Sequence, residues 1–394
     1  MKILQVIPFF SPARGGSVLV TYYLSMELAK RGHDIYIVTT DFEFDEEFAS
    51  NLKPFNVKIL QFKCLIKFQL FLYSPGMKKF LNKHIQEFDV IHLHNFRSYQ
   101  NNVVAAAAIK NRIPYILQAH GSVLRIVEKQ RLKLAYDFFW GKKILKKASS
   151  FISVSRTELE QYKQVGIELN KINLIPNGLD INSFNDLPEY GSFREKYSLK
   201  QDRIILFVGR FHKIKGLDFL IKSFNKLRNE FNDILLVMAG PDDGYKGKLV
   251  KLINKLNLKD NVRIFDYIDP KAAYVDADLV VYPSKYEIFG YVPFESILCG
   301  TPVIVANKCG CGEILGENDI AVLIENDDID GLKREMADII QNPNKAQNMV
   351  ETGRKYIREN LSWKRICEKF ENLYFELIRS NEQNHYNEGK WSYK

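Results

Sequence analysis

The chain has 394 residues, of which 46% are hydrophobic and 26% are charged, as in a soluble globular protein with room for two domains. No apolar run reaches the ~18 residues of a membrane-spanning helix, which excludes a protein built on such helices. The net charge of +9 is uneven, because residues 1–190 carry 25 Lys and Arg against 17 Asp and Glu. This basic half predicts an anionic partner.

The chain starts with a short apolar run that predicts a first buried strand rather than a signal peptide, so we expect a cytoplasmic protein. From there, apolar runs alternate with helical patterns to about residue 180, which predicts a parallel sheet covered by helices. The predicted strands are Ile3–Ile7, Asp34–Thr39, Val57–Gln61, Val90–His94, Tyr115–Ala119, Phe151–Val154 and Ile172–Ile175, and the predicted helices are Val18–Arg31, Gly76–Gln86 and Gln100–Lys110.

Two loops of this half directly follow predicted strands. Gly15 and Gly16 lie between the first strand and the first helix, without the Gly-x-Gly-x-x-Gly pattern of a dinucleotide site. His120 follows the strand Tyr115–Ala119 and precedes a glycine. A plain tight turn is the alternative interpretation of the first loop. A lone histidine is usually structural, but the carboxyl end of a parallel strand is where such sheets bind ligands.

Residues 123–147 combine basic and aromatic side chains. They include eight Lys and Arg against Glu128 and Asp137, with Phe138, Phe139 and Trp140 among the apolar residues. Two interpretations stay open. The segment could lie on an anionic membrane surface, or it could be a helix that packs its apolar face on the first domain and leaves its lysines in water.

The pattern of strands and helices restarts near residue 203, after the polar stretch Ile181–Lys200. We therefore expect an N-terminal domain of residues 1–185 and a C-terminal domain of residues 195–365, with a helix at about 370–385 that crosses back to the first. The predicted strands of the second half are Arg203–Gly209, Ile234–Ala239, Val262–Phe265, Leu279–Tyr282, Pro302–Val305 and Ile320–Ile324.

The first strand of the second half leads into a basic loop. Gly209 lets the backbone come close to a ligand. Arg210 offers a planar fork of donors and Lys215 a point charge, and both suit phosphate oxygens. A solvated basic turn is the alternative interpretation.

Glu287 and Glu295 flank the strongest candidate site. Between them, Ile288, Phe289 and Gly290 present backbone N–H groups near the start of a predicted helix, where phosphate binds well. Two carboxylates that accept from sugar hydroxyls, on either side of an anion site, suit a ligand with sugar at both ends and phosphate in the middle. A nucleotide-sugar is such a ligand. Solvated acids on an ordinary strand–loop–helix are the alternative.

These motifs together resemble those of retaining glycosyltransferases of family 4. Seven residues separate Glu287 from Glu295, with Phe-Gly between them and Gly-Thr-Pro-Val after. Gly209, Arg210 and Lys215 match the family's Gly-Arg-x4-Lys-Gly stretch. The resemblance implies an α/β protein of the GT-B fold, with two Rossmann-like domains that face each other across a cleft.

The resemblance also implies roles for individual residues. Arg210 and Lys215 would bind the donor diphosphate and stabilise it as it leaves. Glu287 would hold sugar hydroxyls and stabilise positive charge on the sugar, and Glu295 would hold the ribose. His120 would contact the donor sugar near the reacting carbon.

The remaining donor-binding groups are backbone. The resemblance implies that Gly15 and Gly16 face the donor phosphates, while Gly209 and the amides of residues 288–290 approach the donor from the C-terminal domain. The chain departs from the family at Asp266, where glycine is usual, and at Cys311, which separates two glycines. The identity of the base is therefore not predicted.

We expect no metal and no cofactor, because Arg210 and Lys215 supply the positive charge that a metal would. Asp276-Ala277-Asp278 matches the Asp-x-Asp that binds metal in another glycosyltransferase fold, but it leads into a predicted strand here. The five cysteines are scattered without metal-ligand spacing, so we expect reduced thiols.

The expected function is transfer of a hexose-type sugar, with retention, from a nucleoside diphosphate donor to a hydroxyl acceptor in cell-surface glycan or glycolipid assembly. A lipid-linked acceptor would fit residues 123–147, with the protein in the cytoplasm or peripheral on the inner face of the membrane. No nucleic-acid partner is expected, since no such motif accompanies the charge. A nucleotide-sugar 2-epimerase of the same fold and a non-catalytic nucleotide-sugar-binding protein stay open as alternatives.

Overall fold

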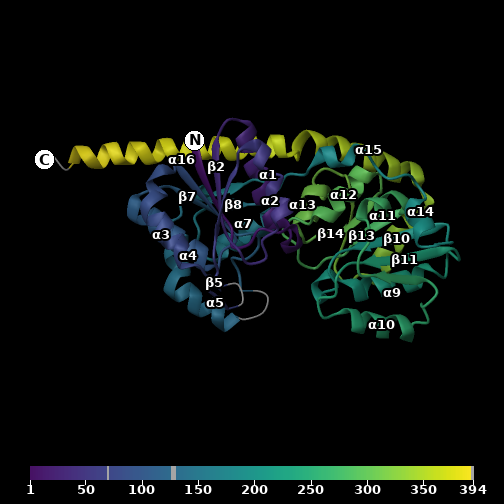
Figure 1. Cartoon of the computed structure of the whole chain (residues 1–394). Coiled ribbons are helices and arrows are strands. Elements are labelled where there is room, and N and C mark those ends of the chain that lie inside the picture. The colour runs from purple at the N-terminus through teal and green to yellow at the C-terminus, as the bar shows by residue number, and fades with distance from the viewer. Residues whose placement is uncertain (69–70, 126–129, 392–394) are drawn as a thin grey trace. The chain divides into compact units, whose positions relative to one another are not determined.

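The structure, a computed structural model, describes residues 1–68, 71–125 and 130–391, with side chains as far as residue 383. The chain divides into two compact units (Figure 1). Unit 1 comprises Met1–Gly178 and Trp363–Lys394, and unit 2 comprises Leu179–Ser362. The division falls just before the stretch expected as a linker, because Phe184 and Phe193 of that stretch are buried in unit 2.

Unit 1 is built on a seven-stranded sheet with the strand order β3-β2-β1-β6-β7-β8-β9. Every neighbouring pair is parallel. The predicted strands of this half are confirmed to within a residue of each end, because strands buried on both faces carry unbroken apolar runs. The strands are β1 (Lys2–Val6), β2 (Asp34–Thr40), β3 (Lys58–Phe62), β6 (Val90–His94), β7 (Tyr115–Gln118), β8 (Ser150–Ser153) and β9 (Ile172–Leu174).

Helices cover both faces of this sheet, so successive residues of a strand enter different cores. Ile3 of β1 packs with α1 and α16, while its neighbour Leu4 packs with α3 and α4. Residues of α16 contribute to the first core at helical spacing, which returns the end of the chain to unit 1. The helices are α1 (Gly16–Lys30), α2 (Glu46–Ser50), α3 (Pro75–His84), α4 (Tyr99–Asn111), α5 (Gln130–Tyr136), α6 (Lys142–Lys147), α7 (Arg156–Gln164) and α16 (Trp363–Trp391).

Two local features of unit 1 were not predicted. A small antiparallel hairpin joins β4 (Ile66–Phe68) to β5 (Phe71–Tyr73). A π-helical turn, η4 (Asp137–Gly141), connects α5 to α6 within the basic aromatic segment. Residues 126–129 of that segment lie outside the described residues.

Unit 2 contains a six-stranded parallel sheet with the order β12-β11-β10-β13-β14-β15. All six predicted strands are confirmed. The strands are β10 (Arg203–Val208), β11 (Ile234–Ala239), β12 (Val262–Phe265), β13 (Leu279–Tyr282), β14 (Val303–Ala306) and β15 (Val322–Ile324). The helical elements are η6 (Ile181–Phe184), α8 (Ser192–Lys196), η7 (Lys213–Lys215), α9 (Leu217–Leu227), α10 (Lys246–Lys255), α11 (Pro270–Asp276), α12 (Tyr291–Cys299), α13 (Gly310–Gly316), α14 (Ile329–Gln341) and α15 (Pro343–Asn360).

Both units therefore have the Rossmann-like topology that was predicted. In each, the first strand has its successors on one side and a later strand on the other, at β1/β6 and at β10/β13. Such a switch in strand order opens a crevice at the carboxyl ends of the two strands, where α/β sheets bind ligands. In the part of the chain that is described, no helix is both long enough and apolar enough to cross a bilayer.

Candidate active site

The candidate site of unit 2 lies at the carboxyl ends of β10 and β13, where the strand order switches. These strands are paired in parallel, so the loops that follow them leave the same edge of the sheet. The loop after β10 carries Gly209, Arg210 and Lys215, and the loop after β13 carries Glu287. The fold thus brings together segments that are more than 70 residues apart in the sequence.

Lys215 and Glu287 form an ion pair at the centre of this site. Lys215 is only 7% exposed. Its Nζ also donates to the Tyr282 hydroxyl at 2.7 Å, and that hydroxyl donates to Glu287 Oε2 at 2.8 Å. Burial and the neighbouring Glu287 raise the pKa of Tyr282 well above its usual value, so the hydroxyl keeps its proton and remains a donor. The sequence identifies Tyr282 only as the last residue of a predicted strand.

Two glycines allow these loops to pack this closely. Gly216 has a φ of 68°, and a Cβ there would overlap the carbonyl oxygen of Pro283. Gly290 has a φ of 74°, and a Cβ there would lie 2.8 Å from Glu287 Cγ. A side chain at either position would therefore separate the loops or displace the glutamate.

The start of α12 presents free backbone amides beside Glu287. Gly290 occupies the N-cap position, and no side chain caps the helix there. In the described part of the chain, the amides of Ile288, Phe289 and Gly290 donate no hydrogen bond. Unpaired N–H groups at the positive end of a helix suit an anion.

Arg210 stands apart from this ion-paired group. Its side chain is 61% exposed, and its guanidinium donates to Asp243 at 2.6 Å. Gly209 before it has a φ of 151°, and the backbone there passes so close to Gly240 that a Cβ on Gly240 would overlap the Gly209 carbonyl. The predicted role of Arg210 therefore requires its side chain to exchange Asp243 for a phosphate.

Glu295 belongs to a different hydrogen-bond network from Glu287. It lies within α12 and accepts from the Tyr274 hydroxyl at 3.2 Å. Burial raises the pKa of its carboxyl. The two glutamates thus lie on one loop–helix segment, as predicted, but differ in their partners.

The start of α13 holds the backbone of Glu287 in place. The amide of Gly310 donates to the Glu287 carbonyl at 2.8 Å, and Cys311 Sγ would lie 3.4 Å from a Cβ on Gly290. All five cysteines are free thiols. Cys309 and Cys311, whose sulfurs are 3.3 Å apart, are buried and pack behind the loop.

The predicted site residues of unit 1 also lie at carboxyl ends of strands. Gly15 has a φ of 89° and precedes α1, whose N-terminus no side chain caps. Asn95 follows β6 and donates to Ser17 of the glycine loop at 3.4 Å. His120 follows β7 with a φ of 50°, in the left-handed region that few residues other than glycine adopt.

Glu158 holds the backbone around His120. Its carboxylate accepts from the amide of Gly121 at 2.6 Å and from the amide of Val154 at 3.0 Å. Burial raises its pKa to about 7, although these two bonds favour the ionised form. Nothing in the sequence had indicated Glu158, because a glutamate on a helix is usually exposed.

The Asp-x-Asp sequence has a structural role. Asp276 accepts from the amides of Gly191 and Arg194, and Asp278 accepts from the amide of Ile204. Both lie at the amino end of β13, opposite the edge that carries Glu287. Asp276 thereby joins the start of α8 to the end of α11, and Asp278 joins the residue before β13 to β10.

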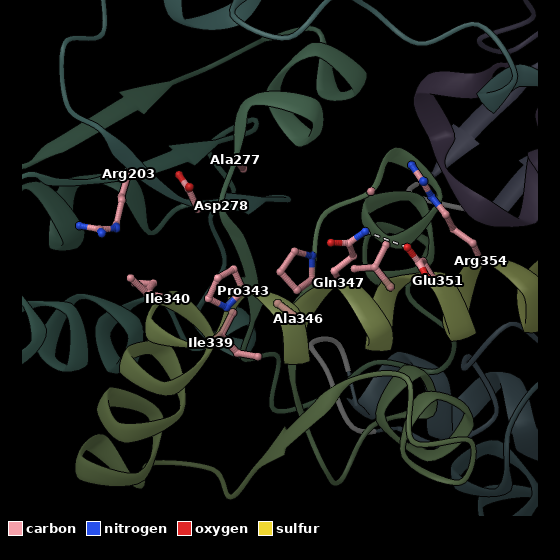
Figure 2. A pocket seen from close by; sticks show the side chains of 13 residues that line it. Arg203, Ala277, Asp278, Ile339, Ile340, Pro343, Ala346, Gln347, Glu351 and Arg354 are labelled. Atoms are coloured by element: carbon pink, nitrogen blue, oxygen red, sulfur yellow. Dashed lines mark hydrogen bonds between the residues drawn. The ribbon is translucent and has the colours of Figure 1, made fainter.

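A pocket of about 430 Å³ lies at that opposite edge (Figure 2). Arg203 and Asp278 line it where β10 and β13 begin, and Gln347 on α15 donates to Glu351 at 2.9 Å. It contains none of the predicted donor-binding residues, so we do not assign the donor to it.

Comparison with known protein families places both halves of the chain in one class. The model of "Glycosyltransferase Family 4" matches residues 14–183, and that of "Glycosyl transferases group 1" matches residues 191–356. An uncharacterised glycosyltransferase of Methanocaldococcus jannaschii is 24% identical over 95% of this chain and 98% of its own length. The N-acetyl-alpha-D-glucosaminyl L-malate synthase of Bacillus anthracis is 22% identical over 94% of this chain and 96% of its own.

Solved structures share the fold. Anabaena HepE in complex with UDP and glucose superposes with a TM-score of 0.75 at 20% identity, covering 95% of this chain and 99% of its own. A glycosyltransferase from Rickettsia africae gives a TM-score of 0.76 at 21% identity, over 96% of this chain and 98% of its own.

Proposed function

The chain belongs to the group 1 glycosyltransferases of the GT-B fold, and on that premise we propose that it transfers a hexose-type sugar from a nucleoside diphosphate to a hydroxyl, with retention. In this reaction the bond between the anomeric carbon and the leaving phosphate oxygen breaks. A bond from that carbon to the acceptor oxygen forms on the same face. The acceptor proton passes to the leaving phosphate, so no protein nucleophile is needed.

The observation that carries this proposal is the buried Lys215–Glu287–Tyr282 group beside the free amides of α12. A lysine ammonium has three N–H donors, and Glu287 and Tyr282 take two of them. The third remains for a phosphate oxygen. As negative charge grows on the leaving diphosphate, Lys215 and the amides of residues 288–290 would stabilise it.

Glu287 would act on the sugar side of the same bond. Lys215 and Tyr282 both bind Oε2 of Glu287, so its second oxygen, Oε1, lies outside both of these contacts. An oxygen with this freedom can accept from a sugar hydroxyl and face positive charge at the anomeric carbon. Support for a nucleotide-sugar donor comes from HepE, whose structures hold UDP, UDP with glucose, and UDP-glucose.

Replacing Lys215 tests the assignment. With UDP-glucose and other nucleotide-sugars as donors, Lys215→Ala should lower kcat by about 10²–10³, the usual cost of removing one charge-stabilising donor. Lys213→Ala is the matched control, because Lys213 lies in the same turn but is exposed. Equal turnover of the two variants would contradict the proposal. Donor epimerised without transfer would instead favour the epimerase, and donor bound without turnover the binding protein.

The acceptor is proposed to be lipid-linked, in cell-surface glycan or glycolipid assembly. Around η4, Phe138 and Phe139 are 70% and 66% exposed, and Leu134 is also exposed. The hairpin β4–β5 exposes Ile66 and Phe68. The lysines and arginines of this surface are Lys63, Lys67, Arg131, Lys133, Lys142, Lys143, Lys146 and Lys147.

An open pocket of about 570 Å³ links the two parts of this surface. Phe71 and Tyr73 of the hairpin line it, together with Trp140 of η4. Lys78 and Lys110 flank it from α3 and α4. An apolar pocket with cationic margins suits an acyl or isoprenoid chain that carries a phosphate, and exposed apolar patches of this kind commonly mark contact surfaces.

Vesicle binding tests this surface. The double variant Phe138→Ser with Phe139→Ser should weaken co-sedimentation with phosphatidylglycerol vesicles by about tenfold or more, because it removes two exposed aromatic side chains that would insert into the bilayer. Tyr190→Ser in unit 2 is the matched control, because Tyr190 is equally exposed. The wild-type protein should also dissociate as salt rises. No binding at low salt would refute membrane contact.

A further inference from the structure

Four polar side chains lie inside unit 1 at strand positions that are otherwise apolar. Gln5 of β1, His92 and His94 of β6, and Gln118 of β7 are all fully buried. They alternate along their strands with core residues, so they face the same side of the sheet, the side that α16 covers. Buried polar groups of this kind must satisfy one another.

Two hydrogen bonds of this group determine which ring nitrogens of His94 and His120 carry a hydrogen. Oε1 of Gln5 lies 2.7 Å from His94 Nε2. An amide oxygen can only accept, so His94 carries its hydrogen on Nε2 and has a lone pair on Nδ1. His94 Nδ1 lies 3.1 Å from His120 Nε2. His120 must then donate from Nε2.

The other buried groups make separate bonds. The Tyr374 hydroxyl of α16 lies 2.7 Å from His92 Nδ1, and Gln118 Nε2 donates to Asn177 Oδ1 at 3.5 Å.

Neither bond connects to His94 or His120, since Gln5 Nε2, His92 Nε2 and Gln118 Oε1 have no hydrogen-bond partner among the described residues. The connected chain is therefore short: His120 donates to His94, and His94 donates to Gln5.

We infer that these three side chains form a directional hydrogen-bond chain, and that Gln5 and His94 act as positioning residues that hold His120 with its hydrogen on Nε2 and a lone pair on Nδ1. The opposite tautomer of His120 would require His94 to carry its hydrogen on Nδ1 and the amide of Gln5 to turn over. If the amide kept its place, its oxygen would face the lone pair of His94 Nε2, and both would lose a buried hydrogen bond.

Two further observations agree with a fixed ring. Burial lowers the pKa of His92 and of His120 to about 3, so both rings are neutral near pH 7 and each carries a single hydrogen. Glu158 holds the amide of Gly121, which fixes the backbone on one side of His120. His120 Nδ1 makes no hydrogen bond among the described residues.

The consequence for specificity rests on the proposed function. With only a lone pair to offer on Nδ1, His120 can accept a hydrogen bond from a sugar hydroxyl but cannot donate one to a sugar carboxylate. The enzyme should therefore discriminate against a hexuronate donor. Turnover of UDP-glucose should exceed that of UDP-glucuronate by about tenfold or more. The sugar carboxylate and the lone pair on His120 Nδ1 are both acceptors, so they cannot hydrogen-bond to each other.

The tautomers can be read directly by NMR of the full-length protein with ¹⁵N-labelled histidine. The wild type should show His120 and His94 each with hydrogen on Nε2. Gln5→Leu removes the acceptor that orients His94, so His120 should populate both tautomers. Gln5→Glu is the matched control, because a carboxylate also accepts from His94 Nε2 and should keep His120 unchanged.

A wild-type His120 with its hydrogen on Nδ1 would overturn the inference, and this result needs no variant to fold. An unchanged His120 in folded Gln5→Leu would also overturn it. The sugar preference is a separate outcome: Gln5→Leu should lose the preference for UDP-glucose while Gln5→Glu retains it. If neither donor is used but the tautomers are as stated, the proposed function fails and the directional chain stands.

Discussion

At the scale of single residues, the site depends on close approaches that only glycine allows. Gly216→Ala should destabilise unit 2 by about 1–3 kcal/mol, because its φ is positive and the new Cβ would overlap Pro283. Gly244→Ala is the matched control, with a φ of 78° but no atom within 4 Å of its Cβ. Urea unfolding measures both, and equal destabilisation would show that only the backbone conformation matters.

Sequence alone predicted that Lys215 and Glu287 share a site, because both follow strands whose carboxyl ends must meet at one edge. It did not predict that Tyr282 joins them, since a tyrosine at the end of an apolar run indicates only a buried strand. Nor did it predict the ion pair between Arg210 and Asp243. The partner of a long exposed side chain depends on the shape of a neighbouring loop, which periodicity does not describe.

At the scale of elements, β6 and α7 carry buried groups whose ionisation should shape the pH dependence of stability. The pKa of His92 is lowered to about 3 from 6.5. Between pH 7 and pH 5 the unfolded chain gains this proton and the folded chain does not, so stability is lost as the pH falls. His92→Phe should remove about 2 kcal/mol of that loss.

Glu158 should act in the opposite sense. Its pKa is raised to about 7 from 4.5, so between pH 7 and pH 5 the folded chain takes up a proton that the unfolded chain does not yet bind. This carboxyl therefore adds stability as the pH falls. Glu158→Gln should remove that gain and steepen the acid loss. If urea unfolding at pH 7 and pH 5 gives both variants the wild-type difference, the burial of these groups does not control stability.

Strands were predictable where a run of apolar residues distinguished them in the sequence. Most strands of the two parallel sheets appear as apolar runs, and the thirteen strands of these sheets in the described part of the chain were all found from the sequence. The hairpin β4–β5 was missed, because its strands are three residues long and expose most of their side chains. The turn η4 was missed as well, since a π-helical turn differs from an α-helix in hydrogen bonding and not in apolar spacing.

At the scale of the whole molecule, the two units have separate cores, so a core substitution should affect one of them. Phe370→Ala removes a buried ring of α16 from the core of unit 1 and should cost about 3–5 kcal/mol. Hydrogen exchange should then rise in residues 1–178 and little in residues 179–362. Phe224→Ala, in the core of unit 2, is the matched control and should show the reverse. Equal rises in both regions would indicate one cooperative unit.

Because the C-terminal helix α16 packs in unit 1, the core of unit 1 can be completed only late in translation. Trp363, Phe370 and Tyr374 of α16 complete a core whose members outside this helix all lie at or before Ile175 in the sequence. A ribosome therefore delivers every residue of unit 2 before unit 1 can close its sheet on that side. Until then the nascent N-terminal half exposes the apolar residues that α16 later covers, and during translation those residues are where a chaperone would bind.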